Sequence, residues 1–269
     1  MISAPAGYVR ASSLDEALEL LADPDAKAIA GGQSLLPVMK LRIARPSLVV
    51  DIGRLDLGGL EVRDGELHVG ALTTWDELVR APELACPALA AVTECAASIG
   101  DLQVRNRGTL GGGLAHADPA SDMPAVLVAL GAQLCLRSPA GERSVAAADF
   151  VSGPFTTALG PRELIVDVVI PVPAPGSGSA YVAVEHPASG FALAGAAALM
   201  RADGSRSVAL TGVGARPILL PADGDPLAAI EAIEIYGDSF APVEYRRHLA
   251  STVARRALER AGARAKENR

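Results

Sequence analysis

The chain has 269 residues, of which 50% are hydrophobic, so it is long enough for one large domain or two compact domains with a well-filled core. The 31 acidic residues outnumber the 24 basic residues and give a net charge of −7. This balance argues against a nucleic-acid partner, because binding to phosphates depends on clustered lysine and arginine. The dense basic stretch near the C-terminus alternates apolar and charged residues at helical spacing, so we interpret it as a solvated helix face rather than a nucleic-acid arm.

Residues 1–54 predict a small α/β unit. The stretch "SSLDEALELLA" is typical of a helix that begins with a capping box formed by Ser13 and Glu16. Two short apolar segments, "KAIA" and "SLVVDI", predict strands. The first of these strands ends at the glycine-containing turn "AGGQS", residues 30–34.

Residues 55–172 predict a mixed α+β fold. The alternating stretch "LEVRDGELHVGAL" has a central Asp-Gly and predicts a β-hairpin. Helices are predicted at "CPALAAVTECAASIG" and, with an early proline and a glycine stop, at "SDMPAVLVALG". Strands are predicted at "AQLCLR", "RSVAA" and "ELIVDVVIP".

The segment "PVPAPGSGS", residues 171–179, is rich in Pro, Gly and Ser and predicts a boundary before a third region, residues 173–269. In that region the stretches "AYVAVEH", "FALAGAAALM" and "SVALTGVGA" predict strands, and "RADGS" predicts a turn between the last two. Helices are expected near residues 226–234 and 243–261.

The three cysteines, Cys86, Cys95 and Cys135, are too few and too far apart for a disulfide framework or a zinc site. They also cannot hold an iron–sulfur cluster alone, because such clusters usually take four thiolates. The N-terminus lacks the pattern of a signal peptide, and no apolar run approaches ~20 residues. We therefore expect a cytoplasmic protein without a membrane span.

A second glycine cluster lies in "RNRGTLGGGLAHADPASD", residues 105–122. Neither cluster is a Walker A loop, and neither has the full spacing of a dinucleotide-binding fold. Glycine lets backbone N–H groups converge on an anion, and the hydroxyls of Ser34 and Thr109 could add donors. Two such turns could hold a diphosphate from both sides, although each cluster taken separately is also typical of a structural turn.

His116 and Trp75 could each have a structural role or a functional role. We interpret His116 as a ring that packs under the second glycine cluster rather than as a proton-transfer group. Trp75, the single tryptophan, follows "LTT" at a predicted helix start and is interpreted as a core anchor rather than a stacking platform.

The stretches "AGGQSLLPVMKLR" and "IGDLQVRNRGTLGGGLAHADPASDMPAVLVALGA" resemble the two FAD-pyrophosphate signatures of the flavoprotein, or medium, subunit of molybdenum-containing hydroxylases. This family includes carbon monoxide dehydrogenase and the flavin domain of xanthine dehydrogenase. The stretches "LIVDVVIP", "TGVGARPILLP" and "APVEYRRHLASTVARRAL" resemble later landmarks of the same family, so the resemblance covers essentially the whole chain.

The resemblance implies an α+β fold with a two-part FAD-binding domain of the PCMH type, residues 1–54 and 55–172, followed by a C-terminal domain with a small antiparallel sheet and helices, residues 173–269. It also implies which residues bind FAD. One side of the diphosphate is expected to contact Ala30, Gly31, Gly32, Gln33, Ser34 and Leu35, and the other side Thr109, Gly111, Gly112 and Gly113. The adenine end is expected to contact Ile99, Gly100, Val104 and Gly108. The ribitol or ribose hydroxyls are assigned to Asp122 beside Ser121, the flavin to Ile165, and the flank of the isoalloxazine to Phe191.

In such enzymes, substrate is oxidised at a molybdenum cofactor in a large subunit, and electrons pass through two iron–sulfur clusters in a small subunit to FAD. The resemblance therefore implies an oxidoreductase subunit that transfers electrons from [2Fe–2S] clusters through FAD to an external acceptor. A large molybdenum-cofactor subunit and a small [2Fe–2S] subunit are the expected partners. No catalytic residue and no metal ligand is assigned to this chain, which fits the lack of a His, Cys or paired-carboxylate constellation.

The sequence departs from the family pattern at Gly113, where members often carry Ser or Asn, and at Ala183 and Gly190, where charged residues are common. Charged groups near a flavin tune its potential, so these departures bear on redox properties more than on the diphosphate site. They keep open a free-standing FAD-dependent oxidase or oxygenase of the same fold. A flavin-free interaction module is a further alternative.

Overall fold

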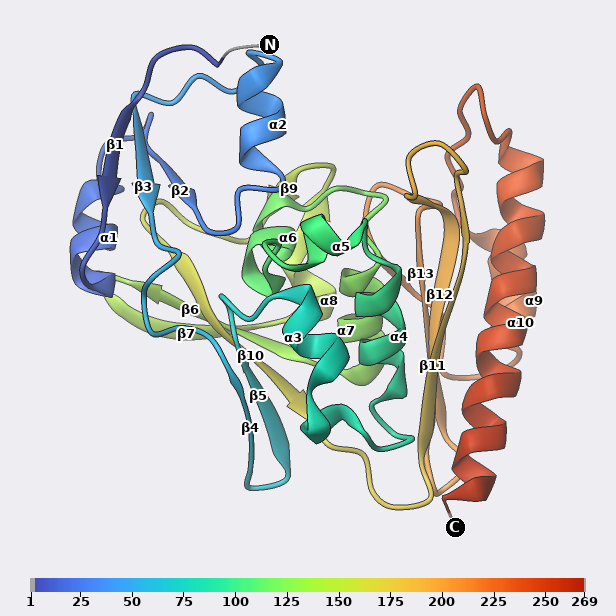
Figure 1. The fold of residues 1–269 in the computed structure, drawn as a ribbon. Helices are drawn as coiled ribbons and strands as arrows, with labels where there is room; N and C mark the ends of the chain where they lie inside the picture. Colours follow the sequence, from blue (N-terminus) through green and yellow to red (C-terminus); the bar gives the residue numbers. More distant parts are fainter. Residues whose placement is uncertain (1–2, 269) are drawn as a thin grey trace.

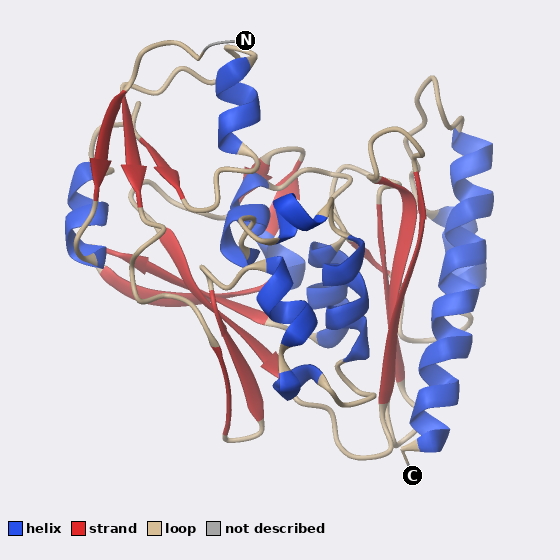
Figure 2. Ribbon diagram, viewed as in Figure 1, coloured by secondary structure: helices blue, strands red, loops and turns tan. Residues whose placement is uncertain are grey.

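The computed structural model describes residues 3–268 and contains three main sheets, with a layer of central helices between the largest sheet and the third sheet. Figure 1 shows the first sheet at the upper left, the largest sheet below it, and the third sheet to the right of the central helices. Figure 2 shows that helices and strands alternate as layers, which end on the right with one long helix.

The first unit is a three-stranded parallel sheet in the order β1-β3-β2. Its elements are β1 (Gly7–Arg10), α1 (Leu14–Leu20), β2 (Lys27–Ile29), α2 (Leu35–Lys40) and β3 (Leu48–Asp51). The predicted helix cap is present, because the Ser13 side chain accepts a hydrogen bond from the Glu16 N–H. The return contact differs from a standard capping box: the Glu16 carboxylate accepts from the N–H and hydroxyl of Ser12.

Two elements of this unit were not predicted from the sequence. β1 has four residues and is largely exposed, so it lacks the apolar alternation of a half-buried strand. α2 contains Pro37, which ordinarily argues against a helix. Pro37 lies in the first turn, where an N–H has no intrahelical partner to lose.

The second unit is a five-stranded antiparallel sheet in the order β4-β5-β10-β6-β7. Its strands are β4 (Leu60–Arg63), β5 (Glu66–Gly70), β6 (Gln133–Ser138), β7 (Gly141–Ala146) and β10 (Leu164–Pro171), with a separate small hairpin of β8 (Val151–Gly153) and β9 (Thr156–Thr157). Its helical segments are α3 (Trp75–Arg80), η1 (Pro82–Leu84), α4 (Ala90–Ser98), α5 (Leu102–Arg105), α6 (Leu110–His116), α7 (Met123–Leu130) and α8 (Ala147–Phe150).

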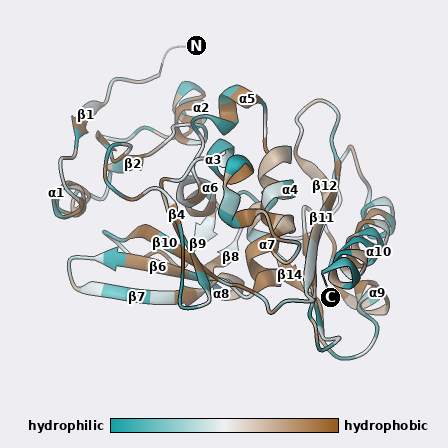
Figure 3. Cartoon of the chain, turned by 60° about the horizontal axis from the view of Figure 1, so that its bottom comes forward, coloured by the Kyte–Doolittle hydropathy of each residue, from teal (hydrophilic) through white to brown (hydrophobic). Residues whose placement is uncertain are grey.

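The predicted hairpin is confirmed: β4 and β5 pair through Asp64 and Gly65, whose φ angles of 53° and 80° suit a type I′ turn. Leu67 and Val69 alternate along β5 and are fully buried against the helices. All eight residues of α7 are buried, so this helix forms the centre of the molecule. Figure 3 shows the same contrast, with hydrophobic brown along α7 and β10 and hydrophilic teal on β7 and on the outer face of α10.

The third unit is a four-stranded antiparallel sheet, β11-β12-β13-β14, covered by a long helix. Its elements are β11 (Gly178–Glu185), β12 (Ala192–Met200), β13 (Arg206–Thr211), β14 (Ile218–Leu219), α9 (Pro226–Ala229), η2 (Ile230–Ala232) and α10 (Val243–Glu267). Alternate residues of β12 face opposite layers: Ala196 and Ala198 pack toward α10, whereas Ala197 and Leu199 pack toward the central helices.

Small side chains let α10 approach the sheet closely. A Cβ on Gly178 would lie 2.5 Å from the carbonyl oxygen of Ala261, so the start of β11 requires glycine at this contact. Each of the three main sheets falls inside one of the ranges 1–54, 55–172 and 173–269. The assignment of these ranges as separate domains stays a prediction.

Candidate functional site

A cleft of about 720 Å³ lies between the first and second units. One wall is formed by the end of α1, by β2 and by the turn that leads into α2, and the other by the start of α6 and by residues 159–165. A volume of this size falls within the range of ligand pockets, roughly 300 to 1,000 Å³. Both glycine clusters line it, so two segments far apart in the sequence share one site.

The first glycine cluster continues β2 into α2, and its two glycines are needed for different reasons. A Cβ on Gly31 would lie 1.7 Å from the carbonyl oxygen of Arg107, so the backbones of the two clusters touch at this point. Gly32 has φ +77°, in the left-handed region that other residues seldom adopt.

This cluster also holds unused hydrogen-bond donors. The backbone N–H groups of residues 31–34 have no hydrogen-bond partner among residues 3–268. Ser34 is the N-cap of α2, but its side chain makes no capping hydrogen bond, so its hydroxyl is free to donate to a ligand. Consecutive free N–H groups at the start of a helix are a favourable site for an anion. The first cluster therefore fits a diphosphate.

The second glycine cluster is closely packed, and its contact with the diphosphate stays a prediction. Its backbone N–H groups already donate within the protein: Gly111 to Ala71, and Gly112 and Gly113 to Thr109. Thr109 is the N-cap of α6 and is buried. These hydrogen bonds hold the cluster as a close-packed wall of the cleft.

Trp75 explains two glycines of this wall. A Cβ on Gly108 or on Gly113 would lie 2.8 Å or 2.7 Å, respectively, from the Trp75 ring. Trp75 is 5% exposed, as expected for a core anchor, and it supports the wall from behind. Gly112 differs, because a Cβ there would meet the Thr109 hydroxyl at 2.8 Å and lie 3.9 Å from the Cβ of Ala30 on the opposite wall.

His116 ends α6 and lines the cleft. Its ring packs against Phe155, with ring centroids 5.2 Å apart. The N–H of Phe155 donates to the carbonyl oxygen of Ala117 over 2.9 Å, and both Ala117 and Phe155 have positive φ angles, 50° and 52°. The interpretation of His116 as a packed ring fits this arrangement.

Most of the predicted FAD-binding residues line the cleft, namely Ala30, Gly31, Gly32, Gln33, Ser34, Leu35, Gly108, Thr109, Gly111, Gly112, Gly113 and Ile165. Six others are not among its lining residues: Ile99, Gly100, Val104, Ser121, Asp122 and Phe191. Ile99 and Gly100 follow α4, and Gly100 has φ +54°. Val104 lies in α5, next to Gly100. The roles of all eighteen residues toward FAD stay predictions.

Asp122 is buried between α7 and the third sheet. Its carboxylate accepts a hydrogen bond from the Tyr181 hydroxyl on β11. Burial raises the pKa of Asp122 to about 6, the bond from Tyr181 opposes that rise, and the charge of Glu185 adds to it. The neighbouring Ser121 carbonyl accepts from the Thr211 hydroxyl over 2.6 Å. Asp122 and Ser121 therefore connect the second unit to the third.

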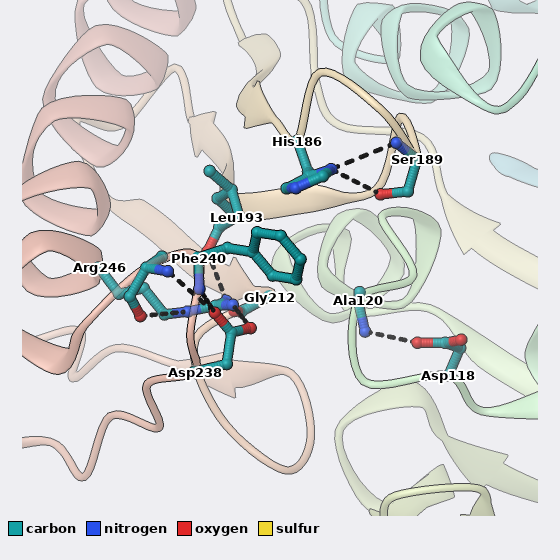
Figure 4. Close-up of polar contacts among 10 residues, drawn as sticks. Asp118, Ala120, His186, Ser189, Leu193, Gly212, Asp238, Phe240 and Arg246 are labelled. Carbon is teal, nitrogen blue, oxygen red and sulfur yellow. Dashed lines mark hydrogen bonds and ion pairs between the residues drawn. The ribbon is translucent and has the colours of Figure 1, made fainter.

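Phe191 lies in the β11–β12 turn, where it is 48% exposed. His186 closes this turn by accepting from the N–H groups of Ala188 and Ser189. The ring of His186 packs edge-on against Phe240, with centroids 4.6 Å apart. Figure 4 shows this pair and the turn at Asp118 and Ala120 nearby.

The segment that carries Phe240 is held by a buried arginine of α10. Arg246 donates to the Asp238 carboxylate over 2.5 Å and to the carbonyl oxygens of Leu193 and Gly212 (Figure 4). The N–H groups of Ala241 and Phe240 lower the pKa of Asp238, and Arg246 adds to the effect. Two of the three departures from the family pattern belong to the third unit: Ala183 is on β11, and Gly190 has φ +73° in the β11–β12 turn.

Sequence reasoning did not identify Lys27 and Arg162, which also line the cleft. Lys27 opens β2 and Arg162 precedes β10, outside both glycine signatures. Their charge was visible in the sequence, but no motif placed them at the cleft.

Two searches of the described residues gave no further site. No helix within residues 3–268 has both the length and the apolar character needed to cross a membrane. The same residues contain no group of three or more His, Cys, Asp or Glu side chains placed to hold a metal ion.

Known proteins similar to this chain match it over nearly its whole length. The medium chain of carbon monoxide dehydrogenase from Afipia carboxidovorans is 37% identical, and the match covers 99% of this chain and 100% of that relative. The structure of reconstituted CO dehydrogenase from Oligotropha carboxidovorans superimposes with a TM-score of 0.93 at 37% identity, covering 98% of this chain and 100% of that one. Quinoline 2-oxidoreductase from Pseudomonas putida 86 gives a TM-score of 0.91 at 33% identity, covering 99% of this chain and 100% of that one.

A family model described as the FAD binding domain in molybdopterin dehydrogenase matches residues 4–173. The predicted α+β fold, the oxidoreductase class and FAD as the cofactor are thereby confirmed. The chain belongs to this family of molybdopterin dehydrogenase flavoproteins, as a medium, FAD-binding subunit of the molybdenum hydroxylase type.

Proposed function

We propose that the chain takes electrons from iron–sulfur clusters of a partner subunit and passes them through its FAD to an external acceptor. The observation that carries this proposal is the meeting of the two glycine clusters at one cleft, with free N–H groups on the first cluster. Bound FAD supplies the electron-transfer chemistry, and the chain supplies binding and orientation.

The residues divide this work between the two walls. The N–H groups of residues 31–34 and the Ser34 hydroxyl are the donors for the diphosphate. The wall from Thr109 to Gly113 is fixed by its own hydrogen bonds and by Trp75, so it limits the width of the cleft. Electron transfer requires no acid–base catalyst on this chain, and we assign none.

Partner subunits follow from the chemistry that this chain lacks. Its thiols lie in different segments: Cys95 is buried in α4, Cys86 is half-buried in the loop before α4, and Cys135 is half-buried in β6. Three separate thiols do not form the four-thiolate set of an iron–sulfur cluster. We propose a small [2Fe–2S] subunit that delivers electrons and a large molybdenum-cofactor subunit that oxidises the substrate, and we place the complex in the cytoplasm.

A flavin titration tests the binding part of this proposal. The purified chain is expected to bind FAD much more tightly than FMN, because the donors of residues 31–34 fit a diphosphate, which FMN lacks. Equal affinity for the two flavins would contradict the assigned role of the glycine clusters.

A second candidate is a free-standing FAD-dependent oxidase or oxygenase. It is favoured by the uncharged residues Ala183 and Gly190, which alter the expected surroundings of the flavin. Co-expression with the large and small subunits distinguishes the two. Co-purification, together with reduction of FAD when the large subunit receives its substrate, supports the electron-transfer subunit. FAD-dependent turnover without partners supports the second candidate, and absence of flavin contradicts both.

A further inference from the structure

Two positively charged side chains line the cleft without an ion-pair partner among residues 3–268, and one acid of the lining, Asp23, also keeps its charge. Among its described lining residues, Lys27 and Arg162 are the lysine and arginine side chains. Two acids, Asp23 and Glu163, also line it, but other groups already bind them. Asp23 accepts from the Ser47 hydroxyl over 2.6 Å, and Glu163 pairs with Arg143 over 2.6 Å. Neither acid forms an ion pair with Lys27 or Arg162.

Arg162 is held in place across the cleft. Its backbone has φ +59°, an uncommon conformation for a residue other than glycine. Its Nε donates to the carbonyl oxygen of Leu18 in α1 over 3.1 Å, which connects the second unit to the first. The two terminal nitrogens have no hydrogen-bond partner among residues 3–268, so they remain available to a ligand.

A diphosphate in this cleft needs charge as well as hydrogen bonds. The free N–H groups of residues 31–34 are dipoles, and they do not neutralise two negative charges. Moving charged groups out of water is costly unless opposite charges accompany them. An arginine held at one nitrogen can still donate from its terminal nitrogens to phosphate oxygens, which makes it well suited to this task.

We propose that Arg162, assisted by Lys27, is the counter-charge for the diphosphate and thereby sets affinity for the ADP half of FAD. This inference rests on the proposed FAD-binding function. It assigns to two residues outside the glycine signatures a part in cofactor specificity. It also implies that ADP, which carries the same diphosphate without the flavin, binds the flavin-free chain and competes with FAD.

Calorimetric titration of the flavin-free full chain with FAD and with ADP tests the proposal. Arg162→Gln is expected to weaken both ligands by about tenfold or more, the effect of losing a hydrogen bond from a charged group. Lys27→Gln, at an exposed strand position, should also weaken the binding of FAD and of ADP. The matched control is Arg42→Gln: Arg42 is exposed, has a positive φ of 61° as Arg162 has one of 59°, and does not line the cleft, so the affinities should stay within about twofold.

Two further measurements distinguish an electrostatic role of Arg162 from a purely structural one: the salt dependence of binding and the affinity of a variant that keeps the charge. Added salt should weaken binding to the parent more than to Arg162→Gln, because salt screens the charge that the variant lacks. Arg162→Lys keeps that charge and should recover most of the affinity. If Arg162→Gln folds poorly, the affinities of Lys27→Gln and the salt dependence of binding to the parent still test whether positive charge in the cleft contributes to binding of the diphosphate.

Three outcomes would overturn the inference: unchanged affinities in both glutamine variants, an equal salt dependence in parent and variants, or a loss confined to FAD with ADP unaffected. Failure of the proposed function is a different result, because the parent chain itself would then bind neither FAD nor ADP.

Discussion

Gly31 and Arg107 meet through their backbones, since a Cβ on Gly31 would lie 1.7 Å from the Arg107 carbonyl oxygen. Gly31 follows β2 and Arg107 precedes α6, so this contact fixes the distance between the two walls of the cleft. The glycine at position 31 therefore controls the width of the site, whereas Gly32 supplies its left-handed turn.

Gly31→Ala is expected to force the walls apart, because the new methyl group would collide with backbone atoms that cannot rotate away. We expect FAD affinity to fall at least tenfold and the unfolding free energy to drop by about 1 to 3 kcal/mol, as for other overpacked sites. Flavin titration and urea unfolding measure the two effects. Gly153→Ala is the matched control, because a Cβ there meets nothing within 4 Å, and it should change neither quantity.

Substitutions of two neighbouring glycines in α6, Gly112 and Gly113, should have different effects on FAD binding and on stability. Gly113→Ala places a methyl group 2.7 Å from the Trp75 ring, so it should destabilise the fold by about 1 to 3 kcal/mol. Gly112→Ala faces the Thr109 hydroxyl and the opposite wall, so its main effect should be weaker FAD binding. Unfolding curves and flavin titrations of both variants check this contrast. A larger loss of stability in Gly112→Ala than in Gly113→Ala would contradict it.

The sequence predicted the local elements of the site better than the hydrogen bonds within it. Glycine spacing correctly indicated that residues 30–34 and 108–113 belong to one cleft. It could not reveal that the N–H groups of Gly111, Gly112 and Gly113 are already engaged, because their acceptors include Ala71, far away in the chain. The reason for Gly113 was equally hidden, since it depends on the tertiary position of Trp75.

The sequence also could not predict which partners far away in the chain bind the charged residues Arg162 and Asp122. Arg162 lies at the cleft because its left-handed backbone and its bond to Leu18 place it there, and neither feature has a local signature. Asp122 was assigned to cofactor hydroxyls from the resemblance, and the structure pairs it with Tyr181 of the third sheet. The β-hairpin at Asp64 and Gly65, in contrast, depends on two adjacent residues and was predicted correctly.

The buried Asp122 should make stability depend on pH. Its pKa of about 6 in the folded chain lies above the ordinary 3.8, so the folded state binds this proton more tightly than the unfolded state does. The resulting stabilisation is complete below the ordinary pKa and is lost as pH rises through about 6. Asp122→Asn removes this titration and can still accept the Tyr181 hydrogen bond.

The unfolding free energy of Asp122→Asn relative to the parent should therefore increase between about pH 4 and pH 7, by up to about 3 kcal/mol. Urea unfolding of both proteins at several pH values in this range measures the difference. Asp203→Asn serves as the control: its exposed carboxylate has a lowered pKa, so it should show no gain over this range. A difference that is independent of pH would contradict the assigned protonation.

Glu94 joins α4, β11 and α10 and should contribute to the attachment of the third unit. Its carboxylate pairs with Arg260 and, over 2.5 Å, with Arg264, and it accepts the N–H of Tyr181 over 2.9 Å. β11 is an edge strand, so without Glu94 the Tyr181 N–H would lose its partner at the sheet edge. Arg264 also donates to the Ser179 carbonyl oxygen over 2.7 Å. One network therefore provides hydrogen-bond partners for a backbone N–H and a backbone carbonyl oxygen on the free edge of β11.

Glu94→Ala is expected to lower the unfolding free energy by about 1 to 3 kcal/mol, because it leaves a backbone donor and two guanidinium groups without their acceptor. Glu94→Gln keeps an acceptor for Tyr181 but loses the charge, so its loss should be smaller. Adding salt should reduce the difference between Glu94→Gln and the parent, since Arg260 is half exposed and its pairing is screened. Urea unfolding at low and high salt measures these effects, with Glu259→Ala on the exposed face of α10 as a control expected to be nearly neutral. If Glu94→Ala were as stable as this control, the network would not hold β11 and α10 to α4.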